Sequence, residues 1–289
     1  MKKKLNIIVI AVLFLAGLSV LLYPFVANQW NSYRQSRLMS SYEEGVAEKD
    51  ANGEIDYEAE WEKARAYNDA LMPMILPDSF AVAEASDRDE AYMNCLNING
   101  DEIMGIVEIP KIDAELPIYH TTDEEVLQIG AGHLEGSSLP VGGESTHAVI
   151  SAHRGLPSAR LFTDLDQLEE GDQFYIHIFD EVLAYEVDQI LPMVDKDDTG
   201  ALQQALAIED GQDYVTLFTC TPYGVHTHRL LVRGTRVEYN GEEDQPETAA
   251  DTVGNLLQDY YMFFLIGGVA VTVIAIGVIR IVMKKKKKE

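Results

Sequence analysis

One cysteine and two arginines near the end of the sequence have the types and spacing that chemistry would need. Cys220 ends the apolar segment VTLFTC and precedes the turn residues TPYG, so its thiol is expected at a strand end within reach of solvent. Arg229 and Arg233 follow in the segment HRLLVRG and share one face if that strand is regular. Nearby cations favour the thiolate, which is the nucleophilic form. The segment therefore predicts a reactive cysteine.

A histidine occupies a comparable position earlier in the chain. His153 stands where the apolar segment AVISAH runs into a turn that contains Gly155 and Pro157. From such a rim an imidazole can face a thiol across a barrel and exchange a proton with it. Cysteine, histidine and arginine together indicate acyl transfer, with a nucleophile, a proton shuttle and a cation for the developing oxyanion or for substrate carbonyls. Face geometry alone does not choose between the two arginines.

Other chemistries have weaker support. His226 and His228 could join Cys220 as three zinc ligands, but no cysteine nearby supplies a fourth ligand and the sequence has no CxxC spacing. Ser151 lies beside His153, yet the sequence has no GxSxG elbow of a serine hydrolase. No metal or organic cofactor is expected. The other histidines are expected to be structural or on the surface: His120, His133, His147 and His177.

Short β-branched segments must hold these residues in place. From Gly105 onward such segments alternate with turn residues: IVEIP, PIYH, AVISAH, QFYIHIF, LAYEVDQILPMV, YVTLFTC and HRLLVRGTRVEY. Their brevity and spacing predict a closed or nearly closed antiparallel barrel, hence a mostly β fold. One helix candidate, Thr199 to Ile208, interrupts the strands.

A region of different amino-acid composition precedes the strands. From Asn28 to about Asn99 the chain is rich in Glu, Ala, Tyr, Lys and Arg. Within it, Tyr57, Trp61 and Ala64 recur on one helical face. The pattern predicts two or more helices before the barrel.

Two apolar runs lie near the ends of the sequence. Leu5 to Val26 contains no charged residue and is long enough, at about 1.5 Å per residue, to cross a hydrocarbon core of about 30 Å. It is interpreted as a retained anchor, with a signal peptide cleaved after Ala27 as the alternative. The second run, Phe263 to Met283, is broken only by Arg280 and precedes five lysines.

Charge is distributed unevenly along the sequence. The chain has 22 Lys+Arg against 48 Asp+Glu, a formal charge of −26, which argues against nucleic acid as a partner. Between the two apolar runs the formal charge is −34, with 13 basic and 47 acidic residues. Since the lysines flank the outer ends of the runs, the positive-inside rule predicts cytoplasmic termini and an extracytoplasmic domain of about 230 residues. Two cysteines allow at most one disulfide, and pairing Cys95 with Cys220 would disable the nucleophile.

Two segments together resemble the sortases, the cysteine transpeptidases of Gram-positive surfaces. TLFTC matches the TLxTC signature, and AHRGLP matches the histidine motif of that family. CTPYGVHTHR resembles the continuation found in the class C, pilus-assembling group, in which an arginine follows the cysteine by nine residues. The likeness covers about residues 60 to 240 and the two apolar runs. It implies a sortase-type closed barrel of about eight strands, with N-terminal helices and two flanking transmembrane helices.

The resemblance also assigns roles to individual residues. It implies Cys220 as the nucleophile, His153 as general acid/base and Arg229 as the group that stabilises the transition state or substrate. Arg233 is then a structural or secondary cation. Cys95 has no assigned role.

Class C sortases further carry an N-terminal lid with a D-P-aromatic motif. The match here is Asp78-Ser79-Phe80, in which Ser79 replaces the proline and Pro77 stands in front. A lid near residues 76–82 would pair Asp78 with Arg229 and hold Phe80 over the thiol, which would exclude water and substrate until the loop moves. The alternative is an acidic exposed loop.

The implied function is pilus assembly at the cell membrane. The enzyme would cleave LPXTG-like sorting signals after threonine and join pilins through a lysine isopeptide bond, so its partners would be pilin or surface proteins with such a signal and an acceptor lysine. One alternative is an anchoring sortase that attaches surface proteins to peptidoglycan precursor. Another is a structural pilin or adhesin that is itself a sortase substrate, with the poor motif match Gln245 to Ala249 as its sorting signal.

The expected domain layout follows from these observations. Its parts are a basic cytoplasmic start (1–4), a first transmembrane helix (5–26), an extracytoplasmic helical region with the lid (27–100), the catalytic barrel (101–240), a linker (241–259), a second transmembrane helix (260–283) and a cytoplasmic lysine-rich tail (284–289).

Overall fold

The computed structural model describes residues 2–71, 78, 80 and 89–241. The chain divides into two units, one formed by Met1–Val26 with Pro246–Glu289 and the other by Ala27–Gln245. All candidate catalytic residues belong to the second unit. The expected linker, second transmembrane helix and lysine tail lie outside the described residues, apart from the first residue of the linker.

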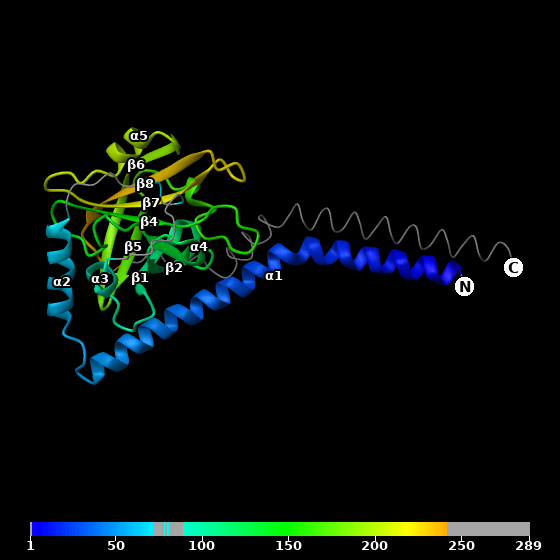
Figure 1. Cartoon of the computed structure of the whole chain (residues 1–289), viewed down its shortest axis with the longest axis horizontal. Helices are drawn as coiled ribbons and strands as arrows, with labels where there is room; N and C mark the ends of the chain where they lie inside the picture. The colour runs from blue at the N-terminus through cyan, green and yellow to red at the C-terminus, as the bar shows by residue number, and fades with distance from the viewer. Residues whose placement is uncertain (1, 72–77, 79, 81–88, 242–289) are drawn as a thin grey trace. The chain divides into compact units, whose positions relative to one another are not determined.

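Among the described residues, α1, α2 and α3 precede the first strand, and α4 and α5 lie between later strands (Figure 1). The elements are α1 (Lys2–Ala51), α2 (Tyr57–Ala70), α3 (Glu90–Asn94), β1 (Ile103–Ile109), η1 (Pro110–Ile112), β2 (Ala114–His120), α4 (Glu124–Leu127), β3 (Ala131–His133), β4 (Thr146–Ser151), η2 (Leu165–Gln167), β5 (Gln173–Ile178), β6 (Glu181–Asp195), α5 (Thr199–Ala205), β7 (Asp213–Thr221) and β8 (His228–Val237).

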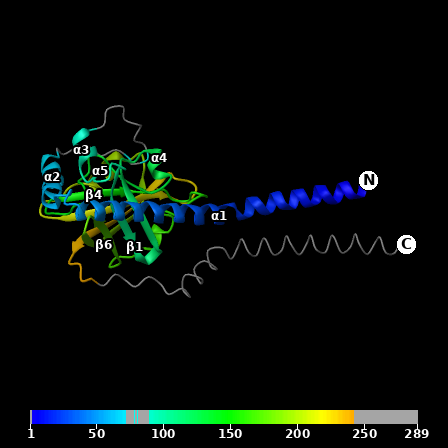
Figure 2. The ribbon, with the colours of Figure 1, turned by 90° about the horizontal axis from the view of Figure 1, so that it is seen from below.

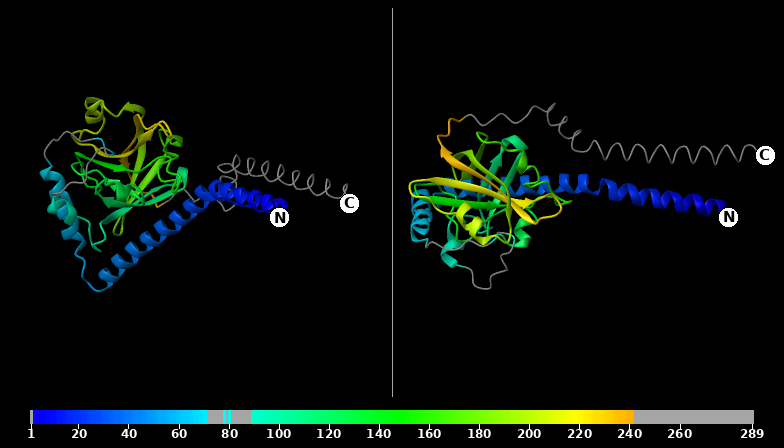
Figure 3. Two further views of the ribbon diagram at one scale, coloured as in Figure 1. Left: turned by 45° about the vertical axis from the view of Figure 1, so that its right-hand side comes forward. Right: turned by 90° about the horizontal axis from the view of Figure 1, so that it is seen from above.

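The eight strands close into a barrel in the order β1-β2-β3-β4-β7-β8-β6-β5. Figure 3 shows this barrel of strands in two further views. The closed barrel is as expected, but a purely antiparallel sheet is wrong. Strand β2 pairs with β3 in parallel, and β4 pairs with β7 in parallel. Strand patterning could not reveal this, because alternation of apolar residues gives the buried face of a strand but not the direction of its neighbour.

Alternating side chains give the sheet two apolar faces around β4 and β7. Ile150 and Leu217 belong to the main core inside the barrel. Their neighbours Val149 and Phe218 belong to a second cluster, which also contains Leu202 from α5 and the adjacent Leu206. Because side chains alternate across a strand, this second cluster covers the outer face of the barrel. Helix α5 is the predicted helix, but it ends at Ala205 rather than Ile208.

Helix α2 forms as its sequence pattern predicts. The Asp56 side chain caps it by accepting a hydrogen bond from the backbone N–H of Ala59 at 3.1 Å. Trp61 and Ala64 are buried, and the Trp61 ring meets the edge of the Phe179 ring with centroids 6.0 Å apart. The helix thus covers one part of the barrel, with its expected apolar face inward.

Helix α1 is longer than the predicted span. The expected boundary near residue 26 does not interrupt it, and no proline after Pro24 stops the helix before Ala51. In the barrel unit, Met39 and Tyr42 of α1 pack with Ile103 and Ile106 of β1. Figure 2 shows the later part of α1 running along the barrel. Among the described residues, one helix is long and apolar enough to span a membrane, with an 18-residue window of mean hydropathy 2.4 within Ile10–Ala51.

Two buried histidines make stability depend on pH. Burial lowers the pKa of His133 and of His147 to about 4 each, from an ordinary value of 6.5. The folded chain therefore binds fewer protons than the unfolded chain below pH 6.5. We expect each histidine to remove about 1.4 kcal/mol of stability per pH unit as pH falls from 6.5 towards 4. Urea unfolding of the full chain in detergent, followed across this range, measures the slope.

A single variant tests the assignment to these histidines. His147 contacts the Ala207 carbonyl oxygen through Nδ1 at 2.8 Å and Thr216 Oγ1 through Nε2 at 2.7 Å. Substitution His147→Gln should remove one histidine's share of the slope. Equal slopes for the variant and the parent protein would contradict the prediction.

Candidate active site

The hairpin of β7 and β8 sets Cys220 and Arg229 opposite each other. The two residues are direct partners in the antiparallel register, which places their Cα atoms about 4.5–5.5 Å apart. Cys220 shares the outer face of the barrel with Phe218, two residues earlier on the same strand. The nine-residue spacing between the cysteine and the arginine is thus the spacing of one hairpin.

The parallel pairing of β4 with β7 brings His153 to the same place. Ser151 is the register partner of Phe218, and the backbone N–H of Ala152 donates to the Phe218 carbonyl at 3.2 Å. Two residues beyond this pair, the chains reach His153 on one side and Cys220 on the other. His153 follows Ser151 by two residues, and Cys220 follows Phe218 by two residues. Because side chains alternate along an extended chain, the imidazole and the thiol point to the same face of the sheet.

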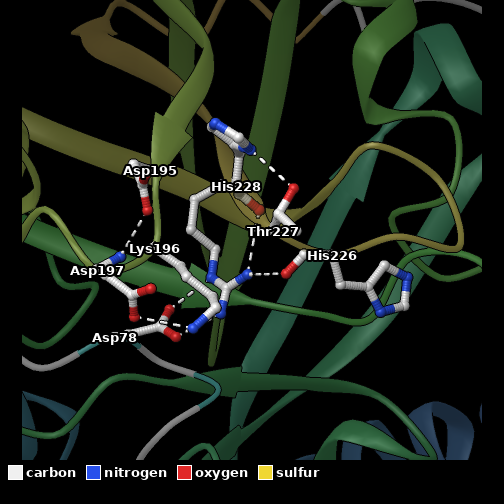
Figure 4. Close-up of polar contacts among 8 residues, drawn as sticks. Asp78, Asp195, Lys196, Asp197, His226, Thr227 and His228 are labelled. Atoms are coloured by element: carbon white, nitrogen blue, oxygen red, sulfur yellow. Dashed lines mark hydrogen bonds and ion pairs between the residues drawn. The ribbon is translucent and has the colours of Figure 1, made fainter.

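Asp78 closes over this face by binding the guanidinium of Arg229. Figure 4 labels Asp78 together with His226 and His228 of the neighbouring turn and strand. Arg229 Nε donates to Asp78 Oδ1 at 2.6 Å, and Nη2 donates to Asp78 Oδ2, so the pair is bidentate. The remaining nitrogen, Nη1, donates to the carbonyl oxygens of His226 at 3.2 Å and His228 at 3.1 Å. The two side chains are only 5% and 10% exposed, so the charge of the arginine is neutralised in a nearly dry environment.

Phe80 covers the neighbouring histidine. Its ring stacks on the His153 imidazole with centroids 5.3 Å apart and on Phe218 at 6.0 Å. The guanidinium carbon of Arg229 lies 5.2 Å from the same ring centroid. One aromatic side chain therefore touches both groups that flank the cysteine. The other residues of the expected lid lie outside the described part of the chain.

The environment of Cys220 disfavours its thiolate. Burial raises the pKa of the Cys220 thiol to about 11, and the carboxylate of Asp78 adds to the rise while Arg229 opposes it. Only 5% of the residue is exposed. With Asp78 and Phe80 in place, the thiol is thus neutral at physiological pH, which is the opposite of the activation that a nearby arginine alone would give.

Glu124 of α4 is a neighbour of the catalytic candidates that the sequence did not reveal. Its Oε2 lies 3.5 Å from His153 Nε2, which is buried and has no hydrogen-bond partner among the described residues. Burial lowers the pKa of His153, whereas the Glu124 carboxylate raises it. The signal for this contact was weak, since Glu124 is one of three consecutive acidic residues.

We expect Glu124→Gln to lower the pKa of His153 because the variant removes the carboxylate that favours the imidazolium. NMR titration of the His153 imidazole measures the shift. Glu125→Gln changes the neighbouring acidic residue and serves as the matched control. An unchanged His153 pKa in the Glu124 variant would contradict the expectation.

The alternative chemistries gain little from the structure. Arg233 binds Asp188 through Nε at 3.0 Å and Nη2 at 2.7 Å, and it lies over the Tyr214 ring. Ser151 Oγ is buried without a hydrogen-bond partner among the described residues, so it has no base beside it. No group of three or more His, Cys, Asp or Glu side chains in the described ranges could hold a metal ion. Cys95 is a free buried thiol, 3.2 Å from the Ala91 carbonyl oxygen.

Comparisons with known proteins point to one family. The Sortase domain family model matches residues 107–237. Sortase D of Bacillus subtilis is 35% identical over 136 residues, which are 46% of this chain and 63% of that protein. The solved structure of sortase C from Streptococcus pneumoniae is 45% identical with a TM-score of 0.60, covering 70% of this chain and 97% of that one. Sortase C1 from Streptococcus agalactiae is 46% identical with a TM-score of 0.62, covering 71% and 100%.

The chain belongs to the sortase family. Within the family it groups with the class C sortases, since solved structures of that class are 42–46% identical to it over almost their whole length. The match to sortase D is shorter and spans less than two thirds of that protein.

Proposed function

We propose that this protein is a membrane-anchored cysteine transpeptidase that polymerises pilins. The observation that carries the proposal is the meeting of three groups on one barrel face: Cys220 opposite Arg229 on β8, with His153 at the same level beyond β4. A nucleophile, a proton shuttle and a cation are what acyl transfer requires. Membership in the class C sortases supports the choice of pilins as substrates.

The proposed reaction has two halves. In the first, His153 takes the proton of the Cys220 thiol, and the thiolate attacks the carbonyl carbon of the threonine in an LPXTG-like signal. The His153 imidazolium then protonates the departing amine, so a thioester forms as the peptide bond breaks. In the second, a lysine amine of the next pilin attacks the thioester. His153 takes the proton from this amine, an isopeptide bond forms and the thiolate leaves. Arg229 stabilises the oxyanion in both halves.

Asp78 and Phe80 act as a lid in this proposal. Their present contacts occupy the guanidinium that would stabilise the oxyanion and cover the imidazole that would move the proton. Substrate can then react only after both side chains withdraw. Withdrawal also frees Cys220 from the Asp78 carboxylate and from part of its burial, so opening the lid activates the nucleophile.

Membrane anchoring suits such a reaction. The apolar helix near the N-terminus supports attachment to the membrane, and the expected cytoplasmic termini and extracytoplasmic barrel remain part of the proposal. Substrates with a sorting signal are also held at the membrane, so enzyme and substrate would meet on one surface and lose less entropy on encounter.

Mass spectrometry of the purified protein incubated with sorting-signal peptides tests the proposal. We expect a thioester adduct on Cys220 and its transfer to a lysine-bearing pilin. Transfer to peptidoglycan precursor and not to pilin would favour the anchoring alternative. Absence of any adduct on Cys220 across a set of such peptides would refute the transpeptidase.

A further inference from the structure

Two threonines flank Cys220, and each is bonded to a residue that flanks His153. On the first side, Thr219 Oγ1 donates to the Ala152 carbonyl oxygen at 2.7 Å. On the second side, Arg154 Nη1 donates to Thr221 Oγ1 at 3.3 Å. The regular pairing of β4 with β7 ends earlier, at Ser151 and Phe218. These two side-chain bonds therefore continue the connection between the strands as far as the cysteine and the histidine.

We call the two side-chain bonds, Thr219 to Ala152 and Arg154 to Thr221, the brace. The other contacts of Arg154 hold its side chain firmly within it. The residue is 8% exposed. Its Nε donates to the Thr163 carbonyl oxygen at 3.0 Å, and its Nη2 binds the Asp166 carboxylate. The planar guanidinium thus reaches three partners at once, which fixes its orientation. One of the three, Thr221, directly follows the proposed nucleophile.

The loop that carries His153 is closed at its base. The backbone N–H of Phe162 donates to the His153 carbonyl at 3.1 Å, and that of Gly155 donates to Thr163 Oγ1 at 3.1 Å. Because Arg154 binds both Thr163 within this loop and Thr221 on β7, it links the whole loop to the cysteine strand.

The brace lies behind the reactive face. Side chains alternate along a strand, so Thr219 and Thr221 point away from the side on which Cys220 and Phe218 stand. The same alternation separates Arg154 from His153 if the chain stays extended there. A change in the brace would therefore alter the spacing of the catalytic groups without removing a group that touches the substrate.

We propose that Arg154 and Thr221 are positioning residues that set the separation between His153 and Cys220 during acyl transfer. The proposal rests on the transpeptidase function given above. Small errors in the placement of reacting groups reduce rate strongly, and an error of about 1 Å can cost about 100-fold. We expect loss of one bond in the brace to lower kcat about 10- to 30-fold and to leave KM nearly unchanged.

Substitutions Thr221→Val and Thr221→Ser form the central test. Valine has nearly the shape of threonine but no hydroxyl, whereas serine keeps the hydroxyl. We expect Thr221→Val and Arg154→Met each to lower kcat, and Thr221→Ser to restore most of the activity. Because both residues act through one bond, the double variant Arg154→Met with Thr221→Val should be no slower than the slower single variant.

One control removes a different partner of the same hydroxyl. Thr221 Oγ1 also donates to Met193 Sδ at 4.0 Å, and Met193 is 52% exposed. Met193→Leu should leave kcat and KM unchanged. Urea unfolding of each variant separates loss of rate from loss of fold, and Arg154→Met leaves behind a carboxylate, Asp166, that is half exposed.

The outcomes distinguish the brace from the function on which it depends. Formation of the Cys220 thioester is followed by mass spectrometry in the full-length parent protein and in every variant. A parent that forms no thioester would overturn the transpeptidase and the brace together. An active parent whose Thr221→Val variant has the same kcat, or whose single-variant losses multiply in the double variant, would overturn the brace alone.

Discussion

Replacing Cys220 with alanine is expected to abolish the thioester and every pilin polymer that depends on it. The sulfur is the only atom of this residue that can form the acyl bond, and alanine carries no nucleophilic atom in its place. The loss should be complete within detection and not a reduction in rate. Polymer ladders on denaturing gels and the adduct mass measure it.

The fold should survive this change. Cys220 is a small buried side chain, and its replacement by alanine should alter the free energy of unfolding by about 1 kcal/mol. Cys95→Ala is the matched control, because Cys95 is also a free and buried cysteine but lies outside the site. Thioester formation by the Cys95 variant and none by the Cys220 variant is the expected pair of results. Ladders at normal yield in Cys220→Ala would contradict the assignment.

Opening the lid should have the next largest effect. In the Asp78→Ala variant the guanidinium loses its bidentate partner and the thiol loses a neighbouring carboxylate. Burial is the largest cause of the raised pKa of Cys220 and Asp78 is a smaller one, so the variant lowers this pKa by removing the carboxylate and by loosening the cover over the thiol. A complete return from about 11 to the ordinary value of 9.0 would raise the thiolate fraction at neutral pH about 100-fold, which sets the upper limit of this effect. We therefore expect alkylation of Cys220 by iodoacetamide to become faster by up to about 100-fold through the pKa, and better access should add to the increase.

The pH dependence of alkylation identifies the cause of this increase. A lower pKa moves the rise in alkylation rate to lower pH, whereas better access alone raises the rate equally at all pH values. Asp188→Ala is the matched control, since Asp188 forms a bidentate pair with Arg233 four residues from Arg229 on β8. Alkylation in that variant should equal the parent rate. An unchanged rate in Asp78→Ala would exclude a lid.

The sequence predicts those parts of the site that local chain geometry determines. The pairing of Cys220 with Arg229 follows from a single hairpin, so the sequence places both arginines of that strand near the thiol. The choice of Arg229 over Arg233 came from the family resemblance. Local sequence is likewise enough to predict the buried helix face that carries Trp61 and Ala64, and most of the strands. The spacing of apolar residues shows which face of a helix or strand is buried, and this prediction does not require knowing which other element packs against it.

Contacts between distant segments were harder to predict. The approach of His153 to Cys220 depends on the parallel register of β4 with β7, which no alternation pattern encodes. The neighbour Glu124 comes from α4, and nothing in its acidic surroundings marks one carboxylate as closer to the imidazole. The strand-end position of His153 indicated the histidine and the family resemblance gave it the acid/base role, whereas the two charged neighbours Glu124 and Arg154 became evident only in the structure.

The position of Arg154 in the sequence is unusual enough to be noticed. It follows His153 directly and lies among apolar and turn residues, where an arginine needs a partner if it is buried. The partners are Thr163, Asp166 and Thr221, and the last of these is 67 residues away in the sequence. An unusual cation could thus be noticed from the sequence, but its function could not.

Strand β7 has a neighbour on each side, β4 and β8. An extended polypeptide that approaches Cys220 therefore meets an interior strand, which is paired as far as Phe218 on the β4 side and as far as Thr221 on the β8 side. Along that paired length it cannot be captured by lengthening the sheet, as in β-augmentation. Selectivity for the incoming peptide should then come mainly from side chains at the ends of these strands, so changes in specificity should follow changes in those side chains.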